Sequence, residues 1–127
     1  MILRAFGLAC IAASVVAGSA LAHHSFAIFD QTKVLNQTGT VKEFELVNPH
    51  AWLHVVITDG QGKSTTWSFE GGSVAQLVGL GWTREGLRVG DKVQVSYRPM
   101  KDGSRGGQIM SVTQADGKKI CSNRGCG

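Results

Sequence analysis

Short segments of alternating apolar and polar residues, separated by turn residues, recur through most of this chain. The clearest is Trp52–Thr58, in which Leu53, Val55 and Ile57 occupy every second position. Because successive side chains of a strand point to opposite faces, this alternation is typical of a strand with one buried face. Asp59-Gly60-Gln61-Gly62 follows as a hairpin turn. This part of the chain is therefore predicted to consist of strands.

Five segments of this kind and one short helix define the expected order of elements. Strands are predicted at 40–46, 52–58, 64–70, 92–98 and 108–114. A helix capped by Ser73 and ending at Leu80 is expected between the third and fourth strands. The order β-β-β-α-β-β is that of an OB-fold, a small and partly open barrel. We therefore predict an all-β fold, an OB-like five-stranded barrel with one short helix, although a split β-sandwich or another small barrel would give a similar pattern.

The first of these strands alternates imperfectly. Strict alternation places Val41 on the same side as Glu43 and Glu45, and Phe44 on the same side as Lys42. Each side is then part apolar and part charged. Such a mixture suits a bent or bulged strand.

The N-terminal stretch has a different character. Arg4 is its only charge, Ala5–Ala17 is almost wholly apolar, and Ala20-Leu21-Ala22 forms an A-x-A cleavage site. These are the three parts of a secretory signal peptide. The apolar run is shorter than the roughly 20 residues that a membrane span needs. We predict that residues 1–22 are removed, and that the mature chain is periplasmic or secreted and does not insert into a membrane.

The remaining chain is expected to form one domain. Residues 23–37 form an N-terminal segment, 38–118 the barrel and 119–127 a tail, a size that fits a single domain. The precursor carries 13 Lys and Arg against 9 Asp and Glu, a net charge of +4. The basic residues are scattered, whereas a nucleic-acid-binding surface needs them clustered. No nucleic-acid partner is expected.

Three cysteines occur, and Cys10 lies within the predicted signal peptide. Cys121 and Cys126 remain near the C-terminus. In an oxidising compartment two cysteines are interpreted first as a disulfide. Free thiols and a metal clip stay open as alternatives.

Four histidines are the most informative residues. His23 and His24 would be the first two residues of the mature chain, and His50 and His54 flank the start of the second strand. If that strand extends back to residue 50, both side chains lie with Trp52 on the face opposite the apolar layer. The histidines are therefore candidate ligands outside the core.

Cleavage before His23 would create a chelating pair of nitrogen ligands. The α-amine has a reference pKa near 8 and closes a ring with the imidazole of the same residue. A third nitrogen from His50 or His54 completes a set that suits Cu(II), because nitrogen-rich tetragonal sites favour that ion. A second geometry uses His24 with the amine and the intervening amide nitrogen. The plainer alternatives are a disordered terminus, His50 bonding to its turn and His54 half-buried in a strand.

Other candidates are weaker. Glu70, at a strand end before Gly71-Gly72, would serve as a ligand or as the hydrogen-bond partner of a ligating histidine. Asp30 and Glu45 are equally weak candidates for the same roles. No carboxylate spacing indicates a paired acid and base, and no serine lies in a nucleophile motif.

The processed N-terminal histidine resembles the histidine brace of copper-dependent polysaccharide monooxygenases and periplasmic copper-binding proteins. The resemblance covers that residue alone and implies no shared fold. It implies that His23 supplies the amine and an imidazole, and that His50 or His54 supplies the third arm.

A second resemblance covers residues 23–118. It rests on the start His23-His24-Ser25-Phe26 with Phe29-Asp30, on Asn48-Pro49-His50-Ala51-Trp52, and on Gly81-Trp82-Thr83, Gly90-Asp91-Lys92-Val93 and Asp102-Gly103. These motifs resemble a bacterial family of small exported proteins of unknown function. The resemblance implies an exported small barrel and no established activity.

These expectations lead to one functional hypothesis and two alternatives. The hypothesis is a periplasmic protein that binds copper, or another late divalent metal, for storage, delivery or protection rather than turnover. The first alternative is a metal-free binding module whose face around Trp52 engages a protein, glycan or small molecule. The second is an oxidative enzyme of the brace type, for which the short loops offer little substrate surface.

Overall fold

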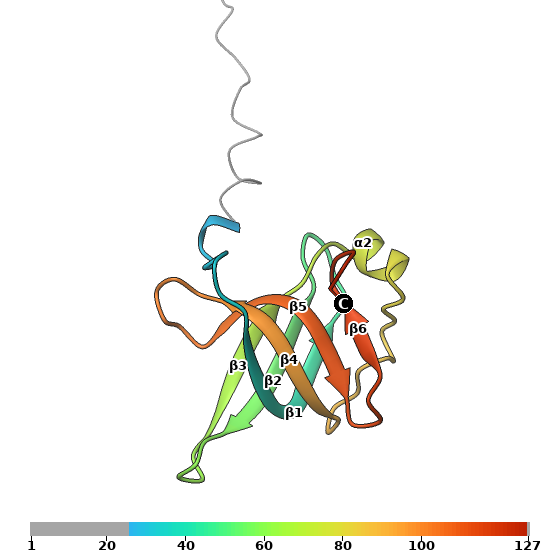
Figure 1. The fold of residues 1–127 in the computed structure, drawn as a ribbon. Coiled ribbons are helices and arrows are strands. Elements are labelled where there is room, and N and C mark those ends of the chain that lie inside the picture. Colours follow the sequence, from blue (N-terminus) through green and yellow to red (C-terminus); the bar gives the residue numbers. More distant parts are fainter. Residues whose placement is uncertain (1–25, 127) are drawn as a thin grey trace, which may run out of the picture.

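The computed structural model describes residues 26–126 (Figure 1). The main elements of this part of the chain are six strands and one helix. They are β1 (Leu35–Glu45), β2 (Trp52–Thr58), β3 (Ser64–Glu70), α2 (Val74–Gly79), β4 (Lys92–Pro99), β5 (Gly106–Gln114) and β6 (Lys119–Cys121). The side chain of Ser73 accepts a hydrogen bond from the Gln76 amide, so the predicted helix cap is confirmed.

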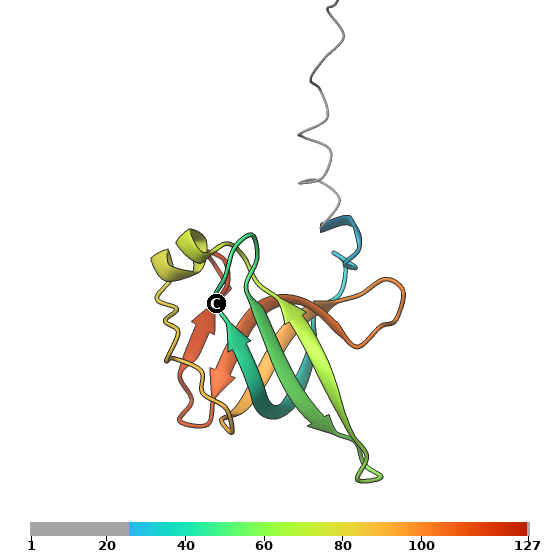
Figure 2. The same ribbon diagram turned by 180° about the vertical axis from the view of Figure 1, so that it is seen from behind.

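The strands form one sheet in the order β3-β2-β1-β4-β5-β6, and β3 also pairs with β5. This last pairing is parallel and closes the first five strands into a barrel. Figures 1 and 2 show the closed barrel from opposite sides, with α2 near one end of it. The predicted small all-β barrel with an OB-like order of elements is confirmed.

The core fills the interior of this barrel. In β2, Leu53, Val55 and Ile57 are buried while the residues between them are half-buried or exposed, as their alternation predicts. Apolar side chains from the other strands and from the connections meet them, and burial of this surface is the main favourable contribution to folding. They include Val41, Phe69, Leu77, Trp82, Val93, Val95, Tyr97, Ile109 and Val112.

A β-bulge in β1 accounts for the imperfect alternation of that strand and confirms the expected bulge. Val41 pairs with Val55 and Glu43 pairs with His54, so Lys42 is the extra residue. The insertion reverses the side of every later residue. Val41 therefore shares the inner side with Phe44, and Glu43 is turned outward.

β1 begins at Leu35, five residues before the predicted strand. Its first part, Leu35–Thr40, pairs with β4, and its second part pairs with β2. The early residues are mostly polar and at least partly exposed, so they carry no alternation that would have marked them as a strand.

The predicted C-terminal tail contributes β6, which pairs with β5. Ile120 of this strand is buried, and the Trp82 indole donates a hydrogen bond to the Cys121 carbonyl at 2.8 Å. Cys121 is joined to Cys126 by a disulfide. The tail is therefore part of the domain.

Closure of the barrel requires a close approach between β3 and β5. A Cβ atom placed on Gly106 would lie 2.0 Å from the backbone oxygen of Ser68. No side chain fits in that space, so glycine is needed at this seam.

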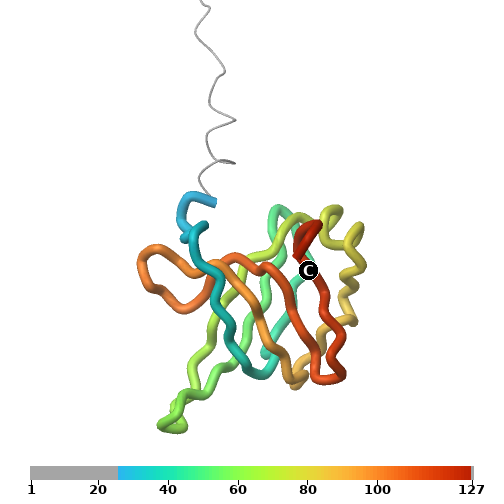
Figure 3. Tube along the Cα trace, viewed as in Figure 1, coloured from blue at the N-terminus to red at the C-terminus, as the bar shows by residue number. Residues whose placement is uncertain are grey.

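The segment before β1 is bound to the barrel. Phe29 is 2% exposed and forms a bridge with Met100, and the Asp30 amide donates to the Pro99 carbonyl at 2.8 Å. Figure 3 shows this segment beside the long loop between β4 and β5. Residues 26–34 therefore follow a defined path over one end of the barrel.

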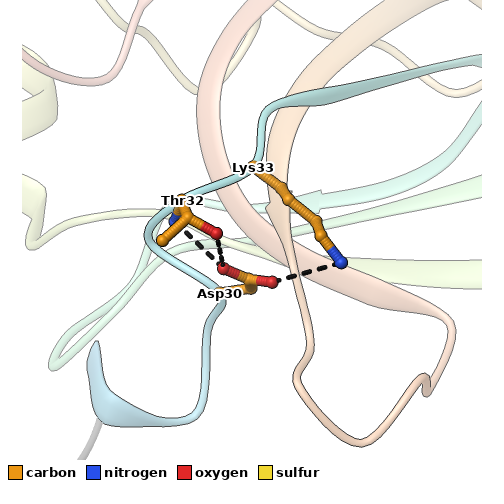
Figure 4. Close-up of polar contacts among 3 residues, drawn as sticks. All are labelled: Asp30, Thr32 and Lys33. Atoms are coloured by element: carbon orange, nitrogen blue, oxygen red, sulfur yellow. Dashed lines mark hydrogen bonds and ion pairs between the residues drawn. The ribbon is translucent and has the colours of Figure 1, made fainter.

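A local turn completes this anchor (Figure 4). The Asp30 carboxylate accepts hydrogen bonds from the amide and the hydroxyl of Thr32 at 3.0 and 2.6 Å, and lies 3.4 Å from the Lys33 amine. These donors lower the pKa of Asp30, the Thr32 hydroxyl most of all. Asp30 has a structural role in this turn.

Within residues 26–126, no helix has the length and apolar character needed to cross a membrane.

Candidate metal centre

His50 lies in the connection between β1 and β2, at the end of the barrel over which residues 26–34 pass. The connection is held against the end of β3. The Ala51 amide donates to the Gly72 carbonyl at 2.9 Å, and the Gly71 amide donates to the Ala51 carbonyl at 2.8 Å. These two bonds place His50 beside Glu70, the last residue of β3.

The His50 and Glu70 side chains form a close pair. The Nδ1 atom of His50 lies 2.5 Å from Oε1 of Glu70, with the two side chains 33% and 12% exposed. An ionised carboxylate only accepts hydrogen bonds, so in this pair Nδ1 carries the proton. The Nε2 atom of His50 then retains its lone pair, which is the arrangement of a ligating histidine held by a carboxylate.

The electrostatics of Glu70 reflect its burial. Desolvation raises its pKa above the ordinary value, and the nearby His50 partly opposes this effect through its charge and hydrogen bond. Loss of hydration thus favours the neutral carboxyl group, while the imidazole favours the carboxylate.

A small cavity lies over this pair. It has a volume of about 60 Å³, and Phe26 from the N-terminal segment lines it together with His50, Glu70 and Gln108. Gly71, Gly72, Gln76 and residues of the C-terminal tail, Ser122 and Asn123, also line it. The cavity is far below the 300–1,000 Å³ of ordinary small-molecule pockets, so it fits an ion and a few small ligands.

His54 has other partners. Its Nδ1 lies 2.8 Å from the Ser68 hydroxyl, and its Nε2 lies 3.1 Å from a carboxylate oxygen of Glu45. It does not line the cavity of His50. The two histidines of the described chain therefore belong to separate clusters, and the structure does not bring them together.

Trp52 lies between these clusters, at the first position of β2. Its ring stacks on that of His54 with 6.4 Å between centroids and an interplanar angle of 7°. It also lines a second cavity of about 210 Å³ with Ile28, Phe29 and Met100. The Trp52 face is thus partly apolar and adjoins the first cavity through Phe29 and Glu70.

His23 and His24 lie outside the described residues, as does the whole predicted signal peptide. Phe26, the first described residue, lines the cavity of His50. The sequence prediction missed Phe26, Gln108, Ser68 and Glu43 as neighbours of the candidate ligands. The pairing of Ser68 with His54 could have been predicted, because a hairpin turn at 59–62 fixes the register of the two strands around it. The pairing of Glu43 depends on the bulge, which alternation alone does not locate.

A comparison with known protein families identifies the family of this chain. The profile of a family of unknown function, DUF6152, matches residues 11–110. The chain belongs to this family. The match spans the four histidines and Glu70 and ends within β5, so β6 and the disulfide lie beyond it. No curated protein and no solved structure matches the chain significantly.

Proposed function

We propose that this DUF6152 protein is an exported copper-binding protein whose site consists of the processed N-terminus and His50. In this proposal the signal peptide is cleaved after Ala22, and His23 supplies its α-amine and its imidazole. His50 supplies the third nitrogen through Nε2. His24 would compete as a ligand through the amide-containing geometry.

The observation that carries the proposal is the pairing of His50 with Glu70. A ligating histidine usually donates its other ring N–H to a carboxylate or carbonyl, which fixes the ring and its tautomer. The distance of 2.5 Å between Nδ1 and the Glu70 carboxylate supplies that contact. Nε2 is the atom left for a metal ion.

Chain length supports convergence of the ligands. His23 precedes Phe26 by three residues, which span about 10 Å when extended. Phe26 lines the same cavity as His50, and the burial of Phe29 fixes the path of the segment behind it. A mature N-terminus at His23 would therefore be within reach of His50.

The chemistry of the donor set favours copper. Three nitrogen ligands, of which two form a chelate, suit the tetragonal geometry of Cu(II), and copper has the highest affinity in the divalent series. A cavity of about 60 Å³ leaves little room for an organic substrate. Storage, delivery or protection is therefore the proposed use, in the periplasm or outside the cell.

The alternative, a metal-free binding module, is supported by the cavity beside Trp52. At about 210 Å³ that cavity is larger and more apolar than the first, yet it is below the usual range for ligand pockets. It would become the leading proposal if copper binding failed.

The test compares two forms of the protein by calorimetric titration with Cu(II). One begins at His23 and the other carries one additional N-terminal residue, which removes the α-amine from the chelate. The proposal expects one tightly bound Cu(II) in the first form and an affinity at least about 100-fold lower in the second, since even an outer-shell change costs 10–100-fold. Equal affinities would refute the proposal.

A pair of variants assigns the third nitrogen. His50→Ala is expected to weaken binding by at least about 100-fold. His54→Ala is the matched control and should leave the tight site unchanged, because His54 lies in the other cluster. The opposite result would transfer the third-ligand role to His54.

A further inference from the structure

A second set of potential metal ligands lies on the outer face of the barrel, apart from His50. Glu43 and Glu45 of β1 and His54 of β2 each offer a ligand atom, and these atoms lie within 4.8 Å of one another. The set combines one imidazole nitrogen with two carboxylates, and its two negative charges match a divalent cation.

The fold positions this set through the β-bulge. Because Lys42 is the extra residue, Glu43 lies directly opposite His54, and Glu45 lies opposite Trp52 on the same face. Without the bulge both carboxylates would point into the barrel. Bulges commonly re-aim side chains next to functional sites, and here the insertion brings two carboxylates beside an imidazole.

The imidazole of His54 is held in place by contacts on two sides. Its Nδ1 lies 2.8 Å from the Ser68 hydroxyl, and its ring stacks on Trp52. Without a metal, Nε2 donates its proton to the carboxylate of Glu45, 3.1 Å away, and Nδ1 accepts from the Ser68 hydroxyl. A cation bound between Nε2 and the carboxylate would displace that proton, and Nδ1 would then carry the ring proton and donate it to the Ser68 hydroxyl.

We propose that Glu43, Glu45 and His54 form a zinc site of the barrel face, independent of the N-terminal copper site. Zn²⁺ binds imidazole nitrogen and carboxylate oxygen at about 2.0–2.2 Å, so its ligand atoms lie about 3–3.5 Å apart. Nε2 of His54 and the Glu45 oxygen are already at 3.1 Å. The exposed Glu43 is free to turn toward them, and water would take the fourth position.

The experiment uses the mature chain with His23→Ala, His24→Ala and His50→Ala. Since the sequence has four histidines, His54 is then the only one left, and the proposed copper site is removed. Calorimetric titration with Zn²⁺ alone should give one bound ion per chain. Failure of the zinc proposal is thereby separated from failure of the copper proposal, which is measured on the intact N-terminus.

Variants in this background identify the ligands. Glu43→Gln should lower the affinity for Zn²⁺ at least about tenfold. Glu85→Gln, the same change at an exposed residue of the connection between α2 and β4, should stay within twofold. Zinc should also shift the ring nitrogen resonances of His54 in NMR spectra. The absence of stoichiometric binding, an equal loss in the two glutamate variants or unshifted His54 resonances would overturn the proposal.

Discussion

The Nδ1 atom of His50, in the connection between β1 and β2, lies 2.5 Å from the carboxylate of Glu70, the last residue of β3. The contact fixes the ring of a partly exposed histidine and leaves Nε2 for a ligand. It also places a largely buried carboxyl group beside the one other titratable side chain that lines this cavity among residues 26–126.

Removal of the charge on Glu70 should weaken the proposed copper site. Glu70→Gln keeps an acceptor for Nδ1 but no longer supports positive charge on the imidazole and metal. We expect about a tenfold loss of Cu(II) affinity, the lower end of the effect of outer-shell partners. Calorimetry on the form that begins at His23 measures it, with Glu85→Gln as the control. Unchanged affinity would show that Glu70 serves only the apo fold.

The raised pKa of Glu70 predicts a pH dependence of stability. The folded protein retains the proton of this group at higher pH than the unfolded chain, whose value is near 4.5. The resulting contribution to the free energy of unfolding is fully present below pH 4.5 and is lost as the pH rises through the folded-state pKa.

Urea denaturation of the wild type and Glu70→Gln at a series of pH values isolates this contribution, because groups common to the two proteins cancel. The difference, wild type minus variant, should fall as the pH rises through that window and then level off. A difference that grows with pH would mean that the ion pair with His50 outweighs the burial of Glu70.

Phe29 should be important for both stability and the proposed site. It is 2% exposed and attaches the N-terminal segment to the barrel. Phe29→Ala is expected to cost about 3–5 kcal/mol in the free energy of unfolding. Val34→Ala, at a side chain that is 54% exposed, should change it by less than about 0.5 kcal/mol. Chemical denaturation measures both, and a comparable loss in the two variants would contradict the anchoring role.

Gly106 should tolerate no side chain. Gly106→Ala introduces a Cβ atom 2.0 Å from the Ser68 oxygen, so β3 and β5 must separate. Forced overpacking costs about 1–3 kcal/mol, and this contact is with backbone, which favours the upper end. Gly60→Ala is the matched control, because nothing lies within 4 Å of its Cβ position. Thermal unfolding of the pair should show a clear loss only for Gly106→Ala.

Much of the barrel could be predicted because its signals are local. The alternation of Leu53, Val55 and Ile57 identified β2, and turn residues separated the strands. The start of β1 and the whole of β6 were not predicted from the sequence, since Leu35–Gly39 shows no alternation and β6 is three residues long. Pairing with β4 and β5 forms these strands, and a single sequence does not encode such pairing in any local pattern.

The candidate site was predictable only in part. Residue chemistry singled out His50 and Glu70, and the structure places them in contact. Sequence spacing suggested that His50 and His54 share a face, yet they have different partners, because residue 50 precedes β2. The group of Glu43, Glu45 and His54 depends on one inserted residue, whose position is decided by packing of Val41 and Phe44 into the core.

The parallel seam between β3 and β5 has a consequence for when the proposed copper site could form in a folding chain. Glu70 pairs with Gln108 across that seam, and Gln108 lies opposite Arg98 of β4. The hairpin of β2 and β3 brings the carboxylate beside His50, and pairing with β5, a distant part of the chain, then holds this strand end in the closed barrel. In a chain whose barrel had not closed, this strand end would be held less firmly, so loading of the proposed copper site would favour finished over unfinished molecules.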